Sequence, residues 1–250
     1  MGAGQWCLLL LAGAAAGLVG SVAGLASLIS YPALLAVGLG PVQANVTNTV
    51  ALCWSSVGSA LGSRVELTGQ ARRLGPLMVA AALGGLAGGG LLLLTPADAF
   101  EQVVPWLIAL ASVLLLVAPA PDELAVHAPG RAGPLLVVGV GLIGIYGGYF
   151  GAAAGVMVLA VLLLSTRDTT VRAIAAKNVL LGVANGVAAL SFVLLGPVDW
   201  ASVLPMAVGF FAGGRAGPAV ARRAPARLLR VLVGLSGLGL AGYLALQTYG

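Results

Sequence analysis

The stretch YGGYFGAAAG, residues 146–155, places four glycines between two strongly apolar segments. The apolar segment 152–165 has only 14 residues, whereas a helix needs about 20 residues to cross the hydrocarbon core of a bilayer. Irregular, glycine-rich backbone is tolerated at membrane depth only where protein covers it or where it lines a cavity. The stretch therefore predicts a helix that breaks inside a membrane, with a half-length element after the break.

The composition of the whole chain also indicates a membrane protein. Of its 250 residues, 60% are hydrophobic and only 8% are charged, and residues 1–63 contain no Asp, Glu, Lys or Arg. Soluble domains carry about 25% charged residues, so this chain has too few to form a soluble surface. We expect an all-α polytopic membrane protein.

The glycine-rich element and its surroundings occur twice. Three pairs of segments match in the same order, namely GLVGSVAG (17–24) with GLIGIYGG (141–148), TNTVALCWSS (47–56) with KNVLLGVANG (177–186), and GGLAG (84–88) with GGRAG (213–217). The offset within these pairs stays between 124 and 130 residues. A nearly fixed offset of this kind indicates a duplication. We therefore expect a first membrane repeat over 1–120, an inter-repeat loop over 121–131 and a second membrane repeat over 132–250.

Each repeat divides into about five apolar segments. They cover 5–24, 26–38, 42–63, 73–94 and 101–118 in the first repeat, and 132–149, 152–165, 173–195, 201–221 and 228–248 in the second. The second segment of each repeat is half-length, which predicts discontinuous helices or re-entrant hairpins at the repeat centres.

The charges between these segments distinguish two topologies. If the half-length segments return the chain across the membrane, each repeat makes five passes and the two repeats are inverted. One face then collects Arg64, Arg72, Arg73, Arg131, Arg167, Arg172, Arg222, Arg223, Arg227 and Arg230. The other face collects Asp98, Glu101 and Asp199 and no basic residue. If the half-length segments only extend their neighbours, the arginines are split between both faces. Because cytoplasmic loops are rich in Lys and Arg, we expect inverted repeats with both termini extracytoplasmic.

The sequence predicts neither an enzyme nor a cofactor. Its one histidine, His127, lies in the loop between the repeats, and the motifs HExxH and GxSxG are absent. Apart from Glu101, the first residue of segment 101–118, no Asp or Glu lies inside a predicted membrane segment where it could act in acid–base chemistry or bind a metal. The arginines sit in short loops between apolar segments, so we expect the bilayer, and not a nucleic acid, as the partner of this basic chain.

Polar residues recur at equivalent places in the two repeats. Asn178 and Asn185 are seven residues apart and therefore share one helix face. Asn48 and Ser55 repeat this face in the first half, and Thr47 aligns with the residue before Asn178. We expect these side chains to line one central substrate site.

Basic residues and glycines complete the predicted site. Lys177, the one lysine of the chain, is next to Asn178. With no acidic partner in the membrane it would favour an anion, or it could snorkel to the cytoplasmic surface. Arg215 has the same two possibilities, the site or the cytoplasmic headgroups. Gly148 and Gly151 lie at the predicted break, where free helix N–H groups could bind an anion.

Two motifs carry a family resemblance. GIYGGYFGAAAG (144–155) followed by AIAAKNVLLGVAN (173–185), with a weaker copy in the first half, resembles the TauE/SafE sulfite exporter family, also called the toluene-sulfonate uptake permeases. The resemblance spans about residues 13–245, although Ser27 and Ser30 replace part of the family's glycine run in the first half. It implies a prokaryotic plasma-membrane exporter of sulfite, organosulfonates or related sulfur-containing anions. The alternative is a non-transporting membrane scaffold or assembly factor that packs through its glycine faces.

Overall fold

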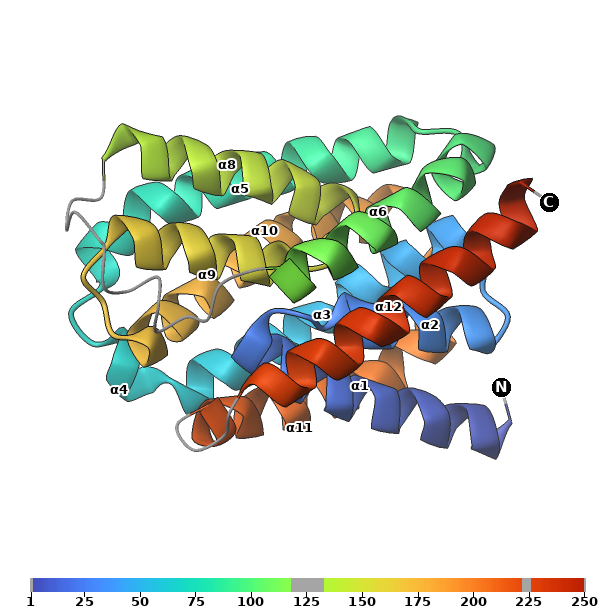
Figure 1. Cartoon of the computed structure of the whole chain (residues 1–250), viewed down its shortest axis with the longest axis horizontal. Helices are drawn as coiled ribbons and strands as arrows, with labels where there is room; N and C mark the ends of the chain where they lie inside the picture. Colours follow the sequence, from blue (N-terminus) through green and yellow to red (C-terminus); the bar gives the residue numbers. More distant parts are fainter. Residues whose placement is uncertain (1, 118–132, 222–225, 250) are drawn as a thin grey trace.

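The computed structural model describes residues 2–117, 133–221 and 226–249, in which every regular element is an α-helix (Figure 1). The first half contains α1 (Ala3–Ala23), α2 (Ser27–Ala36), α3 (Pro41–Gly62), α4 (Arg64–Leu67), α5 (Ala71–Leu94) and α6 (Ala97–Val117). The second half contains α8 (Pro134–Tyr149), α9 (Ala154–Ser165), α10 (Thr170–Leu195), α11 (Trp200–Ala221) and α12 (Ala226–Tyr249).

The prediction of an all-helical polytopic membrane protein is confirmed. Ten of these helices correspond to the ten predicted segments, with ends that differ by at most four residues, and only the short α4 was not predicted. Within the described ranges, α1, α5, α6, α10 and α11 are long and apolar enough to cross a membrane, and α2, α8 and α9 are shorter apolar helices. The predicted loop 121–131, which includes His127 and Arg131, lies outside the described residues, as do Arg222 and Arg223.

Several helix starts follow from local chemistry. Pro41 and Pro134 are the first residues of α3 and α8, where the fixed proline backbone angle suits a helix and the missing N–H has no intrahelical acceptor. Thr169 caps α10, because its side chain accepts a hydrogen bond from the Arg172 N–H at 3.4 Å.

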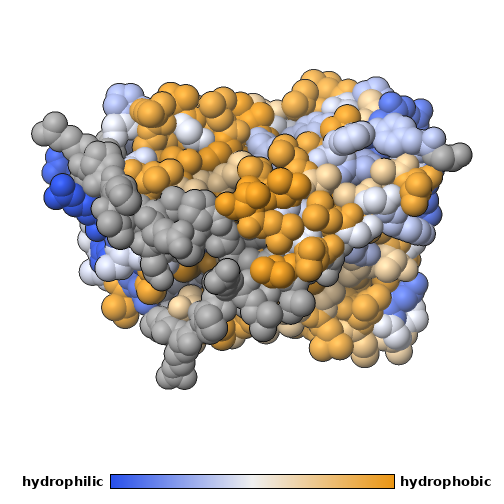
Figure 2. Space-filling model, in the orientation of Figure 1, coloured by the Kyte–Doolittle hydropathy of each residue, from blue (hydrophilic) through white to orange (hydrophobic). Residues whose placement is uncertain are grey.

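The surface has an apolar middle and polar ends. Figure 2 shows hydrophobic residues over the centre of the visible face and hydrophilic residues towards the two ends of the long axis. Large apolar side chains midway along their helices, such as Leu83 of α5 and Leu142 of α8, are exposed, at 63% and 62%. Acyl chains of a bilayer would cover such a belt.

The two ends of the molecule carry different charges. In Figure 1, α1 begins and α12 ends at the right, where α5 connects to α6, whereas α4 and the connection from α9 to α10 lie at the left. The elements at the left carry Arg64, Arg72, Arg73, Arg167 and Arg172. We call this the arginine-rich end. The elements at the right carry Asp98 and Glu101, near the start of α6, and we call this the acidic end.

The helices pack mainly against helices of the other half. Helix α1 packs along α11, and α8 packs in the same way along α5. Likewise α3 contacts α11 while α10 contacts α5, and the pairs α3–α10 and α6–α12 join the halves directly. Figure 1 shows α1 starting at the acidic end and α8 at the arginine-rich end, so these two helices enter the molecule in opposite directions.

Glycines allow the closest of these contacts. A Cβ atom added at Gly84 or Gly88 of α5 would collide with backbone atoms of α8, and one at Gly13 or Gly17 of α1 would collide with backbone atoms of α11. Small residues permit this backbone-to-backbone approach, which drives helix association where water-exposed apolar surface cannot.

The α5–α8 contact predicts different effects for two glycines of the same helix. A Cβ at Gly88 would lie 2.8 Å from the Tyr149 nitrogen, whereas one at Gly90 would meet nothing within 4 Å. We expect Gly88→Ala to destabilise the fold by about 1–3 kcal/mol, as overpacking usually does. Gly90→Ala should leave stability unchanged or raise it slightly. Thermal unfolding in detergent measures the difference, and equal midpoints for both variants would contradict this packing.

Candidate functional site

Two interrupted helical segments, one in each half, come together inside the helix bundle. In the first half, Gly24 follows the last residue of α1; its φ of 80° is left-handed and its N–H donates to the Gly20 carbonyl at 2.8 Å. In the second half, Gly151 and Ala153 have φ of 76° and 58° between α8 and α9. A Cβ at Gly24 would collide with the backbone of Gly155, so the backbones of the two breaks touch. The break predicted within 146–155 therefore lies against its counterpart.

A partly enclosed cavity lies where the breaks meet, and we call it the central cavity. Both halves line it, and its polar side chains include Ser27, Ser55, Ser56, Asn178 and Asn185. The residues that line it in the described part of the chain include no charged side chain. The hydroxyl and amide groups can donate hydrogen bonds to an oxyanion.

The N-termini of two half-length helices also face this cavity. Helix α2 begins at Ser27 and α9 begins at Ala154, and both residues line the central cavity. Most of the first N–H groups of these helices already have backbone acceptors. In α2 the N–H of Leu28 donates to the Leu25 carbonyl, and in α9 the N–H of Val156 donates to the Ala153 carbonyl. The helix dipole still favours an anion at this position.

Several predicted site residues reach the central cavity. Asn178, Asn185, Ser55 and Gly151 line it. Asn48 lies one layer further out, where its side-chain nitrogen donates to the hydroxyl of Ser27 at 3.3 Å. The helical spacing that linked these residues in the sequence corresponds to a shared face in the structure.

Other predicted site residues lie elsewhere. Thr47 accepts a hydrogen bond from the Asp199 N–H at 3.0 Å, near the connection between α10 and α11. Gly148 packs against the backbone of α5, where an added Cβ would collide with Gly85. Arg215 is exposed on α11. The structure does not bring these three residues to the central cavity.

Lys177 is completely buried, with 0% exposure, and does not reach the surface. It is also not part of the lining of the central cavity. Its Nζ donates to the carbonyls of Gly20 and Ser21 at 2.9 and 3.0 Å. These carbonyls belong to the last turn of α1, where the helix dipole favours a basic group. Because Gly20 and Ser21 line the cavity, the hydrogen bonds of Lys177 hold this part of the cavity wall in place from the side that faces away from the cavity.

The two halves support each other's broken helices in this way. From α10, Asn178 donates to the Ser21 carbonyl of α1 at 3.0 Å and to the Ser59 hydroxyl at 2.6 Å. From α3, Asn45 donates to the carbonyl of Tyr149, the last residue of α8, at 2.8 Å. Asn45 is not among the site residues predicted from the sequence. Its position three residues before Asn48, on the same helix, was the available signal.

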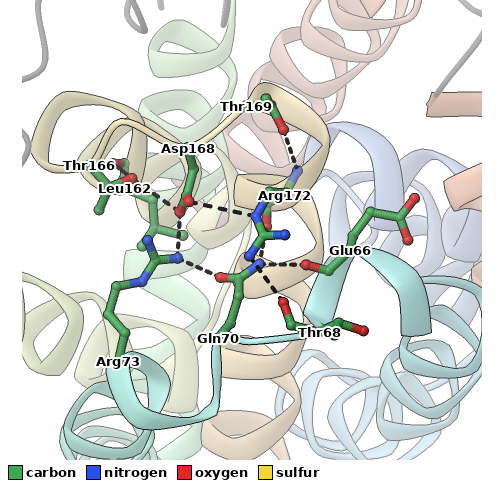
Figure 3. Close-up of polar contacts among 9 residues, drawn as sticks. All are labelled: Glu66, Thr68, Gln70, Arg73, Leu162, Thr166, Asp168, Thr169 and Arg172. Atoms are coloured by element: carbon green, nitrogen blue, oxygen red, sulfur yellow. Dashed lines mark hydrogen bonds and ion pairs between the residues drawn. The ribbon is translucent and has the colours of Figure 1, made fainter.

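At the arginine-rich end a polar network connects the halves (Figure 3). Asp168, between α9 and α10, forms ion pairs with Arg73 of α5 and, at 3.9 Å, with Arg172 of α10. Gln70 accepts from Arg73 and donates to the Glu66 carbonyl, and Arg172 donates to the Thr68 carbonyl at 3.2 Å. From the sequence, these arginines were predicted only to be charges on one face of the membrane. Asp168, an acid among them in RDTTVR (167–172), was the signal for this network.

Comparison with known proteins gives the following relatives. Residues 9–244 match the family model described as "Sulfite exporter TauE/SafE". The chain is 28% identical over 222 residues to "Probable membrane transporter protein YfcA" of Escherichia coli strain K12, covering 87% of this chain and 81% of that protein. It is 26% identical over 230 residues to "Probable membrane transporter protein ORF9" of Sinorhizobium sp, covering 90% and 87%. No solved structure matches.

The surroundings of Lys177 predict how this position responds to substitution. Lys177→Arg must fit a larger, planar group into a fully buried space, and overpacking costs about 1–3 kcal/mol. Lys177→Met keeps the shape and loses two hydrogen bonds to carbonyls that have other donors, Gly24 N–H and Asn178. We therefore expect the arginine variant to unfold in detergent at a clearly lower temperature than the methionine variant. If Lys177→Arg instead unfolded at the same temperature as the native protein, the side chain at this position would reach the membrane surface.

Proposed function

We propose that this chain, which belongs to the TauE/SafE sulfite exporter family, exports small sulfur-containing anions such as sulfite or organosulfonates through its central cavity. The family match identifies a membrane transporter, and not the scaffold that the sequence left as an alternative. We assign the path of the anion to the central cavity because both halves of the chain line it and because α2 and α9 begin there, at Ser27 and Ala154.

The chemistry of the lining suits an oxyanion. Sulfite and sulfonate groups accept several hydrogen bonds, and Ser27, Ser55, Asn178 and Asn185 can donate them. The polar groups sit in a setting of low dielectric, where hydrogen bonds to a charged ligand are worth more than in water. Lys177 serves this site in the proposal by holding the Gly20–Ser21 wall, and not by direct contact.

The proposal includes the division into inverted repeats over 1–120 and 132–250, joined by 121–131. In the two repeats, α1 corresponds to α8 and α5 corresponds to α11. The contact of α1 with α11 is therefore equivalent to the contact of α8 with α5. This supports the division, because a duplicated and inverted unit produces each contact twice. The opposite directions of α1 and α8 in Figure 1 also support it. In such an arrangement, rocking of one repeat against the other opens a fixed central site to each side in turn.

The distribution of charge supports export. The arginine-rich end is the cytoplasmic one in this proposal, in a prokaryotic plasma membrane, which leaves both termini extracytoplasmic. Positive potential at a surface raises the local concentration of anions. Anions would therefore gather at the cytoplasmic end and leave past Asp98 and Glu101 at the other.

Transport is tested with purified protein in liposomes loaded with sulfite or ethanesulfonate. Asn185→Ala and Ser55→Ala each remove a donor that lines the cavity, and hydrogen bonds to charged ligands are worth about 1.5–3 kcal/mol. We expect release to fall about tenfold or more at low anion concentration. Ser191→Ala, on the same helix as Asn185 but outside the cavity lining, is the matched control and should transport normally.

Two further outcomes decide this proposal. Liposomes that contain the native protein and release neither anion faster than protein-free liposomes would contradict the substrate class. Arg215→Ala should leave release unchanged, because Arg215 is exposed on α11 and away from the cavity. A large loss in this variant would place part of the path outside the central cavity.

The topology is tested by labelling in intact cells. In a background without Cys7 and Cys53, we expect a cysteine in place of Asp98 to react with a membrane-impermeant maleimide added outside. A cysteine in place of Arg64, which is also exposed, should react only after the membrane is permeabilised. The reverse pattern would invert the orientation and with it the proposed direction of transport.

A further inference from the structure

A second cavity opens at the acidic end of the molecule. Its walls come from α2, α3, α6 and α12 and include Tyr31, Asp98, Glu101, Gln102 and Gln247. Its lining residues in the described part of the chain include two carboxylates and no basic side chain. We call this cavity the acidic vestibule.

One aromatic pair lies between the acidic vestibule and the central cavity. Phe150 lines the central cavity and Tyr31 lines the vestibule. Their ring centroids are 5.4 Å apart and the rings meet edge to face, at 82°. Both side chains are buried, at 3% and 1% exposure. The two cavities are therefore separated, along this line, by the thickness of two rings in contact.

Both rings are attached to the interrupted segments. Phe150 follows the last residue of α8, at the start of the break between α8 and α9. Tyr31 lies on the half-length helix α2, four residues after Ser27, which lines the central cavity. Residues four apart share one face of a helix. Helix α2 thus connects the two cavities along one face, and a shift of α2 or of the break would move the rings apart.

We propose that Tyr31 and Phe150 form the gate that closes the central cavity towards the acidic end. The inference rests on the proposed function, because it takes the central cavity as the anion path. Edge-to-face aromatic pairs attract each other and exclude water, so an anion cannot pass while the rings touch. Once they part, the anion enters a vestibule whose carboxylates repel it, which favours its release.

The hydroxyl of Tyr31 adds a polar group to this gate. Its oxygen is buried and has no hydrogen-bond partner in the described part of the structure. A buried hydroxyl without a partner is costly, and an anion passing between the rings would accept its hydrogen bond. Phe100 of α6 packs against Phe150, with the two ring centroids 6.1 Å apart, and so supports the gate.

The gate is tested by the reactivity of a cysteine placed behind it. Ser27→Cys, in a background without Cys7 and Cys53, puts a thiol in the central cavity. A membrane-impermeant maleimide is added only from the side of Asp98. We expect slow labelling with the native pair. Phe150→Ala should raise the labelling rate about tenfold, because loss of the aromatic contact shifts the population towards the open gate.

Matched variants separate gating from general loosening. Tyr31→Ala should raise labelling as Phe150→Ala does, and Tyr31→Phe, which keeps the ring, should label as slowly as the native pair. Phe192→Ala removes a fully buried ring that lines neither cavity, and it should leave labelling slow in protein that remains folded.

Two results would overturn the gate. The first is an unchanged labelling rate in both Phe150→Ala and Tyr31→Ala while the denatured proteins label fully. The second is an equal increase in Phe192→Ala, which would mean that any loss of packing exposes Ser27→Cys. Labelling is measured without a transported anion, so it can fail while the native protein still releases sulfite, and the two proposals are separable.

Discussion

A helix that ends inside a membrane leaves backbone carbonyls that water cannot reach, and the structure depends on how these are satisfied. The Gly24 N–H donates to the Gly20 carbonyl from within the same half, but the side-chain donors come from the opposite half of the chain. Lys177 and Asn178 on α10 donate to the end of α1, and Asn45 on α3 donates to the end of α8. Each half therefore needs the other to complete its interrupted segment. The same contacts hold the two breaks against each other and so create the central cavity.

Glycine packing and the cavity are two results of the same close approach. The helix pairs α1–α11 and α5–α8 come into backbone contact through glycines, which brings α3 and α10 close enough to support the breaks. The side chains that line the cavity are all uncharged. Lys177 lies behind one wall, and the residues Arg73, Asp168, Asp98 and Glu101 lie towards the ends of the molecule. In the proposed mechanism, the Tyr31–Phe150 pair closes the central cavity towards the acidic end. At the arginine-rich end, Asp168 joins the halves through its ion pairs with Arg73 and Arg172.

The sequence predicted the helices well because apolar runs and glycine breaks are local signals. It also predicted that Asn178, Asn185 and Ser55 come together, since helical spacing places Asn178 and Asn185 on one face, and all three line the central cavity. That this cavity is a substrate site stays a prediction. It did not predict the partners of Lys177, because the Gly20 carbonyl lies 157 residues away and only the packed bundle joins them. The sequence also left open whether Arg215 faces the site or the surface, and the structure shows that it is exposed. Lipid-facing and protein-facing sides of a membrane helix are both apolar, so the rotation of α11 cannot be derived from its composition.

The central claim is that the anion occupies the cavity between the two breaks. Selenite has the shape and charge of sulfite, and selenium scatters anomalously, so crystals soaked in selenite would locate the anion directly. The expected result is an anomalous peak in the central cavity, within hydrogen-bond distance of Asn178 or Asn185 and beside the starts of α2 and α9. The protein must first be shown to transport selenite in liposomes. If it does, an anomalous peak found only at the arginine-rich end of the crystallised protein would contradict the claim.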